Sequence, residues 1–272
     1  MFIYISLTEY AGLTLVSSVQ IMKTVLLAAG IGQRLGAISG NKPKCLIEFD
    51  GVSLLRRHLR ILEHYGMTEI IIVTGYQSDL VTREASATGT TTTIKYVHNP
   101  DYAKGSLISM LTGFSEMQTD RDFILMDADV LYDHRIIARL INTRHHNCFL
   151  LDRDFAAGEE PVKLCVRDGR LIEFRKKING KLQFDLQGES VGFFRFAPGT
   201  ALQLRHTAES YLQRGEDQQP YEECIRDLLL DNPEDFGYED ITGLNWIEID
   251  FPEDIIKARN TILPHMQQLD RP

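Results

Sequence analysis

A short apolar run that ends in a glycine-rich turn constrains the fold more than any other part of this sequence. Residues 25 to 36 read VLLAAGIGQRLG, in which the run at 25–27 passes through two alanines to Gly30 and Gly32. Such a run is typical of a buried strand in a parallel sheet, and the glycines allow a tight turn whose backbone N–H groups can surround a phosphate. We therefore expect a phosphate-binding loop directly after a buried strand.

Two kinds of ligand use such a loop, a dinucleotide or the triphosphate of a single nucleotide. The dinucleotide fingerprint GxGxxG needs a third glycine and then an unbroken helix, but Leu35 stands at the third position. The following GAISGNKPKC contains two glycines and Pro43, which interrupt a helix. Asp50 lies where a ribose-binding acid would stand, but without the helix this position carries little weight. The sequence favours a mononucleotide triphosphate.

The composition narrows the class of protein. With 272 residues, of which 43% are hydrophobic, the chain can bury a large core as one domain. Its formal net charge of -9 disfavours nucleic acid and anionic membrane surfaces as partners. The cysteines are far apart and lack the spacing of a zinc site, which favours reduced thiols and a cytoplasmic location. They are Cys45, Cys148, Cys165 and Cys224. An oligomer is compatible with the sequence, which does not specify one.

Both ends of the chain are expected to lie outside the main domain. Residues 1–21 are mildly apolar, but they have neither the basic start of a signal peptide nor an apolar run that could span a membrane. Met22 stands directly before the first convincing strand, so we expect 1–21 to be an N-terminal extension outside the fold. An additional edge strand is the alternative. A single domain is expected over 22–262 and a C-terminal tail over 263–272.

Strands and helices alternate over the first half of the chain. Ser53 is a suitable N-cap for a helix with a leucine-rich face, and a second helix is expected from Ser106 to about Gln118. This alternation predicts an α/β, Rossmann-like fold with a mostly parallel sheet, helices on both faces, and ligands at the carboxyl ends of the strands. The expected strands lie at 46–49, 69–76, 91–99 and 122–129.

After residue 145 the pattern changes to short strands joined by tight turns. PVKLCV, LIEF, KLQFDL and VGFFRF indicate strands, and the DG pair after the first is a hairpin signal. We expect them to form an antiparallel β lid over about 148–196, inserted in the domain. Trp246 is expected in the core. The rest of the chain is predicted as helices near 198–214 and 219–230, a strand at 245–250 and a helix from Pro252.

Two cations flank the turn-rich segment that follows the glycine loop. Arg34 and Lys44 stand beside the exposed backbone N–H groups and together suit a triphosphate. Arginine presents a planar fork to paired phosphate oxygens, whereas lysine is a mobile point charge that can follow a phosphorus centre through the reaction. The alternative is that these residues and Lys42 are solvated surface charges.

The loop and its cations together resemble a known signature. LAAGIGQRLGxxxxxxKPKCL is similar to the glycine loop, arginine and lysine of nucleotidyltransferases that activate sugar phosphates, polyol phosphates and phosphocholine, which have a GT-A-like fold. The resemblance extends through VTGY and WIEIDFPEDI and covers most of 22–262. It implies that the loop backbone and Arg34 hold the nucleotide phosphates, that Lys44 lies near the reacting phosphoryl group, and that both cations are catalytic. The loop positions are Ala28, Ala29, Gly30 and Gly32.

Acidic residues at strand ends are expected to hold a metal ion. Joining a phosphate to the α-phosphorus of a nucleoside triphosphate brings two anions together, and Mg²⁺ bound by one or two carboxylates relieves the repulsion. Asp127 and Asp129 follow the strand FILM on the same side. The resemblance implies that Asp129 and Asp250 are the metal ligands. Helix capping is the alternative for Asp127, and Asp254 is assigned to the dipole of the last helix.

The segment HNPDYAKGSLISM places Gly105 and Ser106 at the start of a helix after a strand. The resemblance implies that backbone and hydroxyl groups there read the base. Some sugar-phosphate members carry a glutamine three residues before this glycine, where Tyr102 stands here, and this departure favours CTP over UTP or dTTP. An ordinary N-cap is the alternative role for Ser106.

The expected lid resembles that of cytidylyltransferases acting on phosphocholine or 2-aminoethylphosphonate, which pair a cationic with an anionic end. Such an acceptor needs lysine at its phosphoryl side and acids or aromatic rings at its ammonium side. Two lysines suit the first task, three acids suit the second, and Phe193 could form a wall. Charges on antiparallel strands often face water instead. The candidates are Lys163 and Lys176, and Asp152, Glu160 and Glu189.

The joint pattern predicts a Mg²⁺-dependent cytidylyltransferase. It would transfer CMP from CTP to a small phosphorylated or phosphonate amino-alcohol and release pyrophosphate. A sugar- or polyol-1-phosphate nucleotidyltransferase with the same core chemistry is the alternative. A non-catalytic nucleotide-binding regulator is a third reading, and the presence of both cations and both acids disfavours it.

Overall fold

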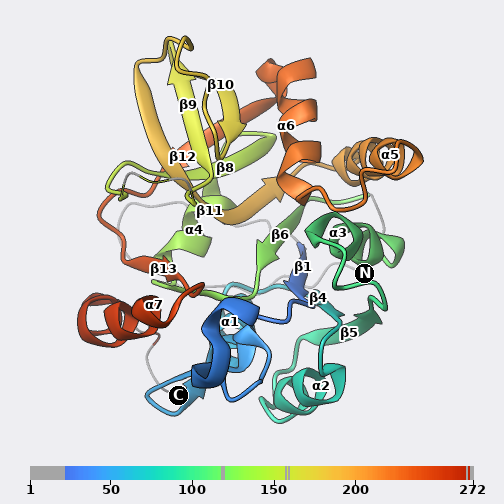
Figure 1. Ribbon diagram of the computed structural model, residues 1–272, viewed down its shortest axis with the longest axis vertical. Helices are drawn as coiled ribbons and strands as arrows, with labels where there is room; N and C mark the ends of the chain where they lie inside the picture. Colours follow the sequence, from blue (N-terminus) through green and yellow to red (C-terminus); the bar gives the residue numbers. More distant parts are fainter. Residues whose placement is uncertain (1–21, 118–119, 157, 159, 268, 270–272) are drawn as a thin grey trace, which may run out of the picture.

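The computed structural model describes residues 22–117, 120–156, 158, 160–267 and 269 (Figure 1). The expected N-terminal extension at 1–21 lies outside the described residues. The strands are β1 (Lys23–Ala28), β2 (Glu48–Phe49), β3 (Val52–Ser53), β4 (Glu69–Thr74), β5 (Thr93–His98), β6 (Phe123–Asp127), β7 (Val130–Tyr132), β8 (Asn147–Asp152), β9 (Lys163–Arg167), β10 (Arg170–Arg175), β11 (Leu186–Phe196), β12 (Phe236–Asp240) and β13 (Trp246–Glu248). The α-helices are α1 (Leu54–His64), α2 (Ser78–Ser86), α3 (Ser106–Ser115), α4 (Arg135–Asn142), α5 (Thr200–Gln213), α6 (Tyr221–Asp231) and α7 (Pro252–Lys257). The shorter helical turns are η1 (Gln33–Ser39), η2 (Lys44–Leu46), η3 (Pro233–Asp235), η4 (Ala258–Ile262) and η5 (Leu263–His265).

A nine-stranded sheet forms the centre of the protein. Seven strands follow the order β10-β9-β11-β6-β1-β4-β5, and β8, paired with β11, also carries β12. β1 is parallel to β4 and to β6, and β4 is parallel to β5. Because the chain reaches opposite sides of β1 in these two pairings, the carboxyl end of β1 is a topological switch point, where ligands of such sheets bind. The expected α/β fold with a mostly parallel sheet is confirmed.

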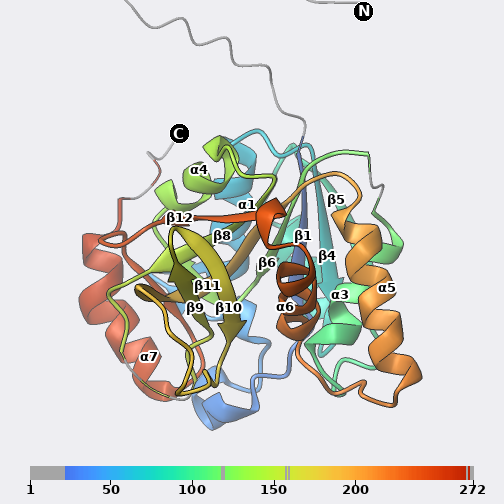
Figure 2. The ribbon, with the colours of Figure 1, turned by 90° about the horizontal axis from the view of Figure 1, so that it is seen from above.

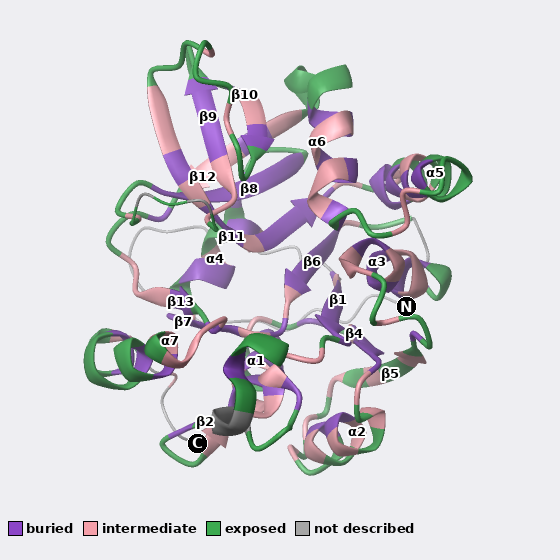
Figure 3. Ribbon diagram, viewed as in Figure 1, coloured by how far each residue is buried: buried purple, intermediate pink, exposed green. Residues whose placement is uncertain are grey.

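Both faces of the central strands are buried, which explains their continuous apolar runs. In β1, Val25 and Leu27 belong to the hydrophobic cluster under α3, α5 and α6, whereas Leu26 and Ala28 belong to the cluster under α1, α2 and α4. This alternation follows from the period of two along a strand. Figure 2 shows the helices on the two sides of the sheet, and Figure 3 shows the buried strands between them. Ser53 caps α1 as expected, accepting the N–H of Arg56 at 3.1 Å.

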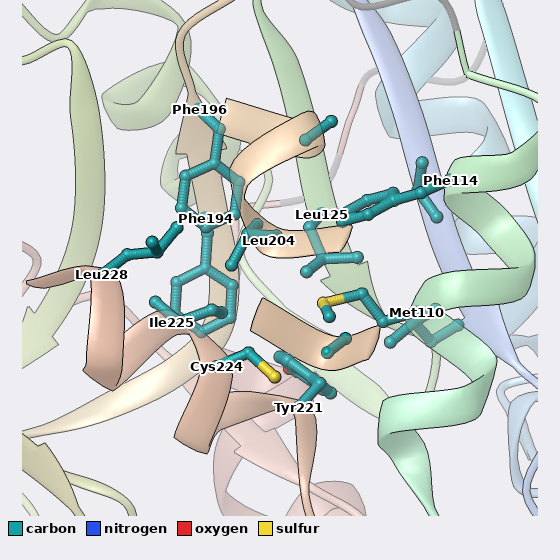
Figure 4. Close-up of a cluster of buried hydrophobic side chains, with 14 of the residues drawn as sticks. Met110, Phe114, Leu125, Phe194, Phe196, Leu204, Tyr221, Cys224, Ile225 and Leu228 are labelled. Carbon is teal, nitrogen blue, oxygen red and sulfur yellow. The ribbon is translucent and has the colours of Figure 1, made fainter. Parts of the chain in front are cut away.

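The hydrophobic cluster under α3, α5 and α6 holds α6 against the sheet. Figure 4 shows Met110 and Phe114 of α3 facing the strand residue Leu125, with Phe194 and Ile225 on the other side. These side chains are buried, and such close-packed contacts hold a helix in one position. The first turn of α6 is therefore fixed against the sheet.

The antiparallel strands continue the central sheet. β11 pairs with β6, β8 and β9, and the β9–β10 hairpin turns at Asp168 and Gly169, whose φ values of 51° and 73° suit a two-residue turn. The prediction that KLQFDL forms its own strand is wrong. Residues 182–185 are irregular after a turn in which the N–H of Leu182 donates to the carbonyl of Asn179, and a single strand runs from Leu186 to the end of VGFFRF.

The segment that follows α7 packs against the domain. Leu263, in the expected tail, is 6% exposed in the cluster under α7, and the N–H of Gln267 donates to the carboxylate of Asp133 at 2.8 Å. Within the described residues, no helix is long and apolar enough to cross a membrane.

Candidate active site

The loop after β1 has the backbone that the glycines predict. η1 is kinked at Gly36, so the unbroken helix of a dinucleotide site is absent from this segment. Gly32 has a φ of 70°, and a Cβ placed on it would lie 2.7 Å from Cγ of Lys44. Only glycine lets the lysine stem pass at this distance, which explains the residue at this position. Asp50, the ribose candidate of the rejected alternative, has a φ of 53° in the turn between β2 and β3.

A cavity of about 330 Å³ opens beside this loop, and we call it the nucleotide cavity. Both predicted cations line it together with one predicted metal ligand. Ala29 lies just behind, with its carbonyl accepting the N–H of Tyr76 at 3.1 Å. The lining residues that the sequence predicted are Ala28, Gly30, Gly32, Arg34, Lys44 and Asp129.

Short antiparallel pairing of β7 with β13 brings the predicted metal ligands together. Val130 pairs with Glu248, and the N–H of Ile249 donates to the carbonyl of Asp129 at 3.0 Å. This ladder places Asp129 beside Asp250 although they are far apart in the sequence. Glu248 completes the cluster, and one carboxylate oxygen from each of the three residues lies within 4.8 Å of the others.

Three carboxylates at this spacing suit a hard divalent cation, because Mg²⁺ is held by oxygen ligands and commonly by one or two carboxylates with phosphate oxygens. The sequence reasoning missed Glu248. The signal was available, since Glu248 and Asp250 stand two apart in WIEID and so point to the same side of the strand. Although Glu248 is exposed at the mouth of the site, the protein atoms crowded around its carboxylate, followed by the negative charges of Asp129 and Asp250, raise its pKa to about 8. This shift is the mark of an anionic cluster whose charge is not fully balanced.

Both cations contact this cluster. The ammonium of Lys44 donates to Asp129 at 3.0 Å and also contacts Asp250. Burial alone would lower the pKa of Lys44, but the two carboxylates outweigh it and raise the pKa above its ordinary value. Arg34 lies 3.1 Å from Asp250 and 3.3 Å from Glu160, with its guanidinium over the ring of Phe251. Lys44 is therefore partly buried within the cluster, whereas Arg34 pairs with it from the surface, with 48% of its side chain exposed.

Gly105 and Ser106 lie at the start of α3 but do not line the nucleotide cavity, to which this region contributes Tyr102 and Ala103. Ser106 is the first helical residue and not the N-cap, and its hydroxyl accepts the N–H of Tyr221 at 3.1 Å. Gly105 has a φ of 151°, and the backbone of Gln218 lies 3.2 Å from the Cβ that another residue would have. Both residues thus join α3 to the segment before α6.

A second cavity of about 250 Å³ lies on the other side of the acidic cluster, and we call it the acceptor cavity. Asp250 and Glu248, two members of the acidic cluster, line this cavity. Four of the five predicted acceptor residues line it, namely Asp152, Glu160, Lys176 and Glu189. Lys163 does not, because its ammonium donates to the backbone carbonyls of Pro161 and Lys176 at 3.0 and 2.8 Å.

Two aromatic residues lie differently from what the sequence suggests. Phe193 is fully buried between His58 and Tyr132 and forms no wall of the cavity. Trp246 is only half-buried, lines the acceptor cavity and donates its indole N–H to Asp152 at 2.7 Å. A tryptophan whose N–H reaches a cavity carboxylate is part of the site and not merely of the core.

Asp127 faces the acceptor cavity and caps no helix. Its carboxylate accepts the hydroxyl of Tyr221 at 2.7 Å. Gly192 has a φ of 78° and makes room for it, since an added Cβ would lie 2.5 Å from the carboxylate oxygen. Burial raises the pKa of Asp127, and Asp129 and Glu222 add to the effect. The capping function near α4 belongs to Asp133, which accepts the N–H of Arg135 at 3.0 Å. Asp254 has the helix-terminal role predicted for it, accepting the backbone N–H of Phe251 at 2.7 Å.

Comparison with known proteins agrees with this geometry. Residues 24–179 match the family described as the MobA-like NTP transferase domain. The CTP:phosphoglutamine cytidylyltransferase of Campylobacter jejuni is 24% identical over 86% of this chain and 98% of its own length. The CMP-5'-(3-aminopropyl)phosphonate synthase of Streptomyces rubellomurinus is 26% identical over 91% of this chain, which spans 40% of that protein. The inositol-1-phosphate CTP transferase of T. maritima has the same fold, with a TM-score of 0.72 at 18% identity over 92% of this chain and 99% of the other.

The chain belongs to the MobA-like NTP transferase family, and it is an enzyme of the nucleotidyltransferase type. The predicted resemblance is confirmed.

Proposed function

We propose that this MobA-like NTP transferase is a Mg²⁺-dependent cytidylyltransferase. It transfers CMP from CTP to a small phosphorylated or phosphonate amino-alcohol of the phosphocholine or 2-aminoethylphosphonate type and releases pyrophosphate. Residues 22–262 act as one domain in this proposal, with the acceptor lid over about 148–196.

One observation carries the proposal: the two cavities meet at the same charged cluster. Asp129 lines the nucleotide cavity, Asp250 lines the acceptor cavity, and the ammonium of Lys44 contacts both carboxylates. A group bound in one cavity is thus next to a group bound in the other. Such an arrangement suits transfer between two ligands and has no purpose in a site that only binds one.

The chemistry requires positioning and neutralisation of charge. An oxygen of the acceptor phosphate or phosphonate forms a bond to the α-phosphorus of CTP, while the bond from that phosphorus to the bridging oxygen breaks and pyrophosphate leaves with the electron pair. No side chain is needed to remove a proton, since the attacking oxygen is already ionised at neutral pH. Arg34 and Lys44 contribute positive charge to the triphosphate, where charge develops on the leaving group. Asp129, Asp250 and Glu248 would hold Mg²⁺, which supplies further neutralisation when bound.

The choice of CTP and acceptor rests on the relatives and on two parts of the site. The Campylobacter and Streptomyces proteins are named for a cytidine nucleotide and a phosphorylated or phosphonate partner. Tyr102, which replaces the glutamine of some sugar-phosphate enzymes, lines the nucleotide cavity. The acceptor cavity combines Lys176 with several acids, which suits a zwitterionic acceptor better than a neutral sugar ring.

A polyol- or sugar-1-phosphate nucleotidyltransferase is the second candidate, because the T. maritima protein of the same fold is named for inositol 1-phosphate. A nucleotide-binding regulator without catalysis is disfavoured by the full set of Arg34, Lys44, Asp129 and Asp250 in one cluster.

The test is pyrophosphate release with each of the four nucleoside triphosphates, combined with phosphocholine, aminoalkyl phosphonates, hexose 1-phosphates and inositol 1-phosphate. We expect release with CTP and an amino-alcohol acceptor in the presence of Mg²⁺, and none after addition of a chelator. Release with hexose 1-phosphates alone would replace the proposal with the second candidate. Tight CTP binding without turnover for any acceptor would support the regulator.

A further inference from the structure

We propose that the acceptor cavity selects a cationic group that carries N–H donors, as in a primary ammonium, over a quaternary trimethylammonium, and that Asp152 and Glu189 bind it. The inference rests on the proposed function and narrows it to acceptors of the aminoalkyl phosphate or phosphonate class. It assigns the discrimination between the two acceptor types to named side chains.

The carboxylate of Asp152 is held in a fixed orientation at one end of the cavity. One oxygen accepts the backbone N–H of Asp154 at 2.9 Å, and the other accepts the indole N–H of Trp246 at 2.7 Å. The residue is 6% exposed. An ionised carboxylate has about four acceptor positions, so two donors leave room for the N–H groups of a ligand.

Glu189 stands directly opposite Asp152 where β11 pairs with β8. Like charges at directly opposed positions destabilise a sheet unless a cation lies between them. In the part of the chain that the structure describes, the side chain of Glu189 forms no hydrogen bond or ion pair. Lys163 lies on the neighbouring strand β9, but its ammonium donates to backbone carbonyls instead. Burial, followed by the charge of Asp152, raises the pKa of Glu189 to about 7. Lys163, opposite Glu189 on β9, and Lys257 offset part of this shift, but neither ammonium forms an ion pair with the two carboxylates, so a cation bound between them would stabilise the pair.

Glu222 gives an independent indication of a ligand. It follows Tyr221 in the first turn of α6 and lines the same cavity. Its Oε2 atom is buried and has no hydrogen-bond partner. A buried acceptor without a donor is costly in a folded protein, and a ligand N–H or a bridging water is the usual remedy. The cavity therefore offers unsatisfied acceptors at two places.

The aromatic rings around the cavity do not form a cage for methylated nitrogen. A quaternary ammonium has no N–H and is recognised by the faces of aromatic rings. Phe174 and Phe194 are buried in the core, where they pack edge to face with each other. The ring of Phe251 is covered by Arg34, and Trp246 presents its N–H edge to Asp152. The indole N–H lies in the plane of its ring, so among the described lining residues Trp246 and Phe155 keep open ring faces, and two rings alone do not close a cage.

The experiment compares three acceptors that differ at one end only: 2-aminoethylphosphonate, its N,N,N-trimethyl derivative and ethylphosphonate. We expect kcat/KM with CTP to be at least about tenfold higher for the primary amine than for the trimethyl compound, since the latter leaves the acidic acceptors unpaired. Glu189→Gln and Asp152→Asn should each lower the ratio of kcat/KM for the amine to kcat/KM for ethylphosphonate by about tenfold, because only the amine uses these carboxylates. Glu209→Gln, an exposed change on α5, is the matched control and should leave the preference as it is.

Binding of the same three compounds, measured by calorimetry in the presence of CTP analogue and Mg²⁺, separates this inference from the proposed function. Preferential binding of the amine that depends on Glu189, without any turnover, would support the assignment of the acceptor cavity and refute the proposed transfer of CMP. Equal or better use of the trimethyl compound would overturn the inference while leaving cytidylyl transfer intact. So would an unchanged preference in both carboxylate variants.

Discussion

The nucleotide cavity and the acceptor cavity meet at one acidic cluster, but they are built in different ways. On the nucleotide side Gly32, Arg34 and Lys44 come from the segment that follows β1, Tyr102 and Ala103 complete the lining, and the cations are already paired with Asp129 and Asp250. The acceptor side collects carboxylates from four strands and two helices, β6, β8, β11, β13, α6 and α7, and the buried Oε2 atom of Glu222 has no hydrogen-bond partner.

This difference indicates how each side gains its ligand. On the nucleotide side the cations must exchange carboxylates for phosphate oxygens, so a metal ion and the triphosphate are expected to bind together and to favour one another. On the acceptor side Lys176 has to exchange Glu160, 3.3 Å away, for the phosphoryl group, whereas an incoming cation finds no ion pair to displace at Asp152 and Glu189. In the proposed function, the loop backbone and the two cations hold the triphosphate for the reaction, whereas the acids of the acceptor cavity determine which acceptor binds.

The largest effect is expected at the shared cluster. Asp129→Ala removes a carboxylate that Lys44 contacts and that would hold the proposed metal ion, and we expect turnover to fall by at least about a thousandfold, since several kcal/mol of charge stabilisation would be lost. Pyrophosphate release measures the effect, and thermal unfolding followed by circular dichroism checks that the fold remains. Asp231→Ala, an exposed change at the end of α6, is the control. Activity within tenfold of the unchanged protein would contradict the metal role.

The next effect tests the nucleotide loop alone. Gly32→Ala puts a methyl group 2.7 Å from Cγ of Lys44, so the lysine must move, and kcat/KM for CTP should fall by about a hundredfold. Gly36→Ala is a matched control, because Gly36 also has a positive φ, of 51°, but its added Cβ meets no atom within 4 Å. Both variants should lose a similar stability of about 1 kcal/mol from backbone strain. Equal loss of activity in both would show that the contact with Lys44 is unimportant.

A third effect, confined to the acceptor side, is a dependence on pH. The pKa of Glu189 is raised to about 7 because the group is buried and faces Asp152, and Lys257 and Lys163 reduce the shift. Since an ammonium binds the ionised form, the KM for an aminoalkyl phosphonate should rise by about tenfold as the pH falls from 8 to 6. The same aminoalkyl phosphonate measured with Glu189→Gln serves as the reference, because it includes the titration of the phosphonate itself. The ratio of the KM of the unchanged protein to that of Glu189→Gln should rise as the pH falls, and a ratio that is flat with pH would refute the assignment.

The smallest effect distinguishes two lysines of the lid. Lys176 lines the acceptor cavity and Lys163 does not. Lys176→Met should raise the KM for the acceptor by about tenfold, whereas Lys163→Met should change it by less than about threefold, because its ammonium only joins backbone carbonyls. Steady-state kinetics at saturating CTP measures both. A larger effect from Lys163 would mean that the lid rearranges when the acceptor binds.

Much of the catalytic half could be predicted from the sequence, because its signals are local. The strand at 23–28, the positive φ of Gly32 and the placement of Arg34 and Lys44 all depend on neighbouring residues. Asp129 and Asp250 were predicted as a pair through a resemblance. Glu248 was missed, although it stands two residues before Asp250 and so points to the same side of the chain.

The acceptor half was predicted only in part. Asp152, Glu160, Lys176 and Glu189 do line a common cavity, but Trp246 was expected in the core and Lys163 in the cavity. The hydrogen bond from Tyr221 to Asp127 and the unpaired Glu222 had no signal in the sequence, since both depend on how α6 packs against β6.

The sequence by itself determined the alternation of strands and helices, the phosphate-sized loop after the first strand and the chemical kind of its side chains, because periodicity and turn preference act over a few residues. Only the tertiary structure decided which acids share a site. The pairing of β7 with β13 joins Asp129 to Asp250, and the opposed register of β8 and β11 sets Glu189 against Asp152. Such pairings depend on the packing of the whole sheet, and a shift of one residue in either would turn these carboxylates to the opposite face.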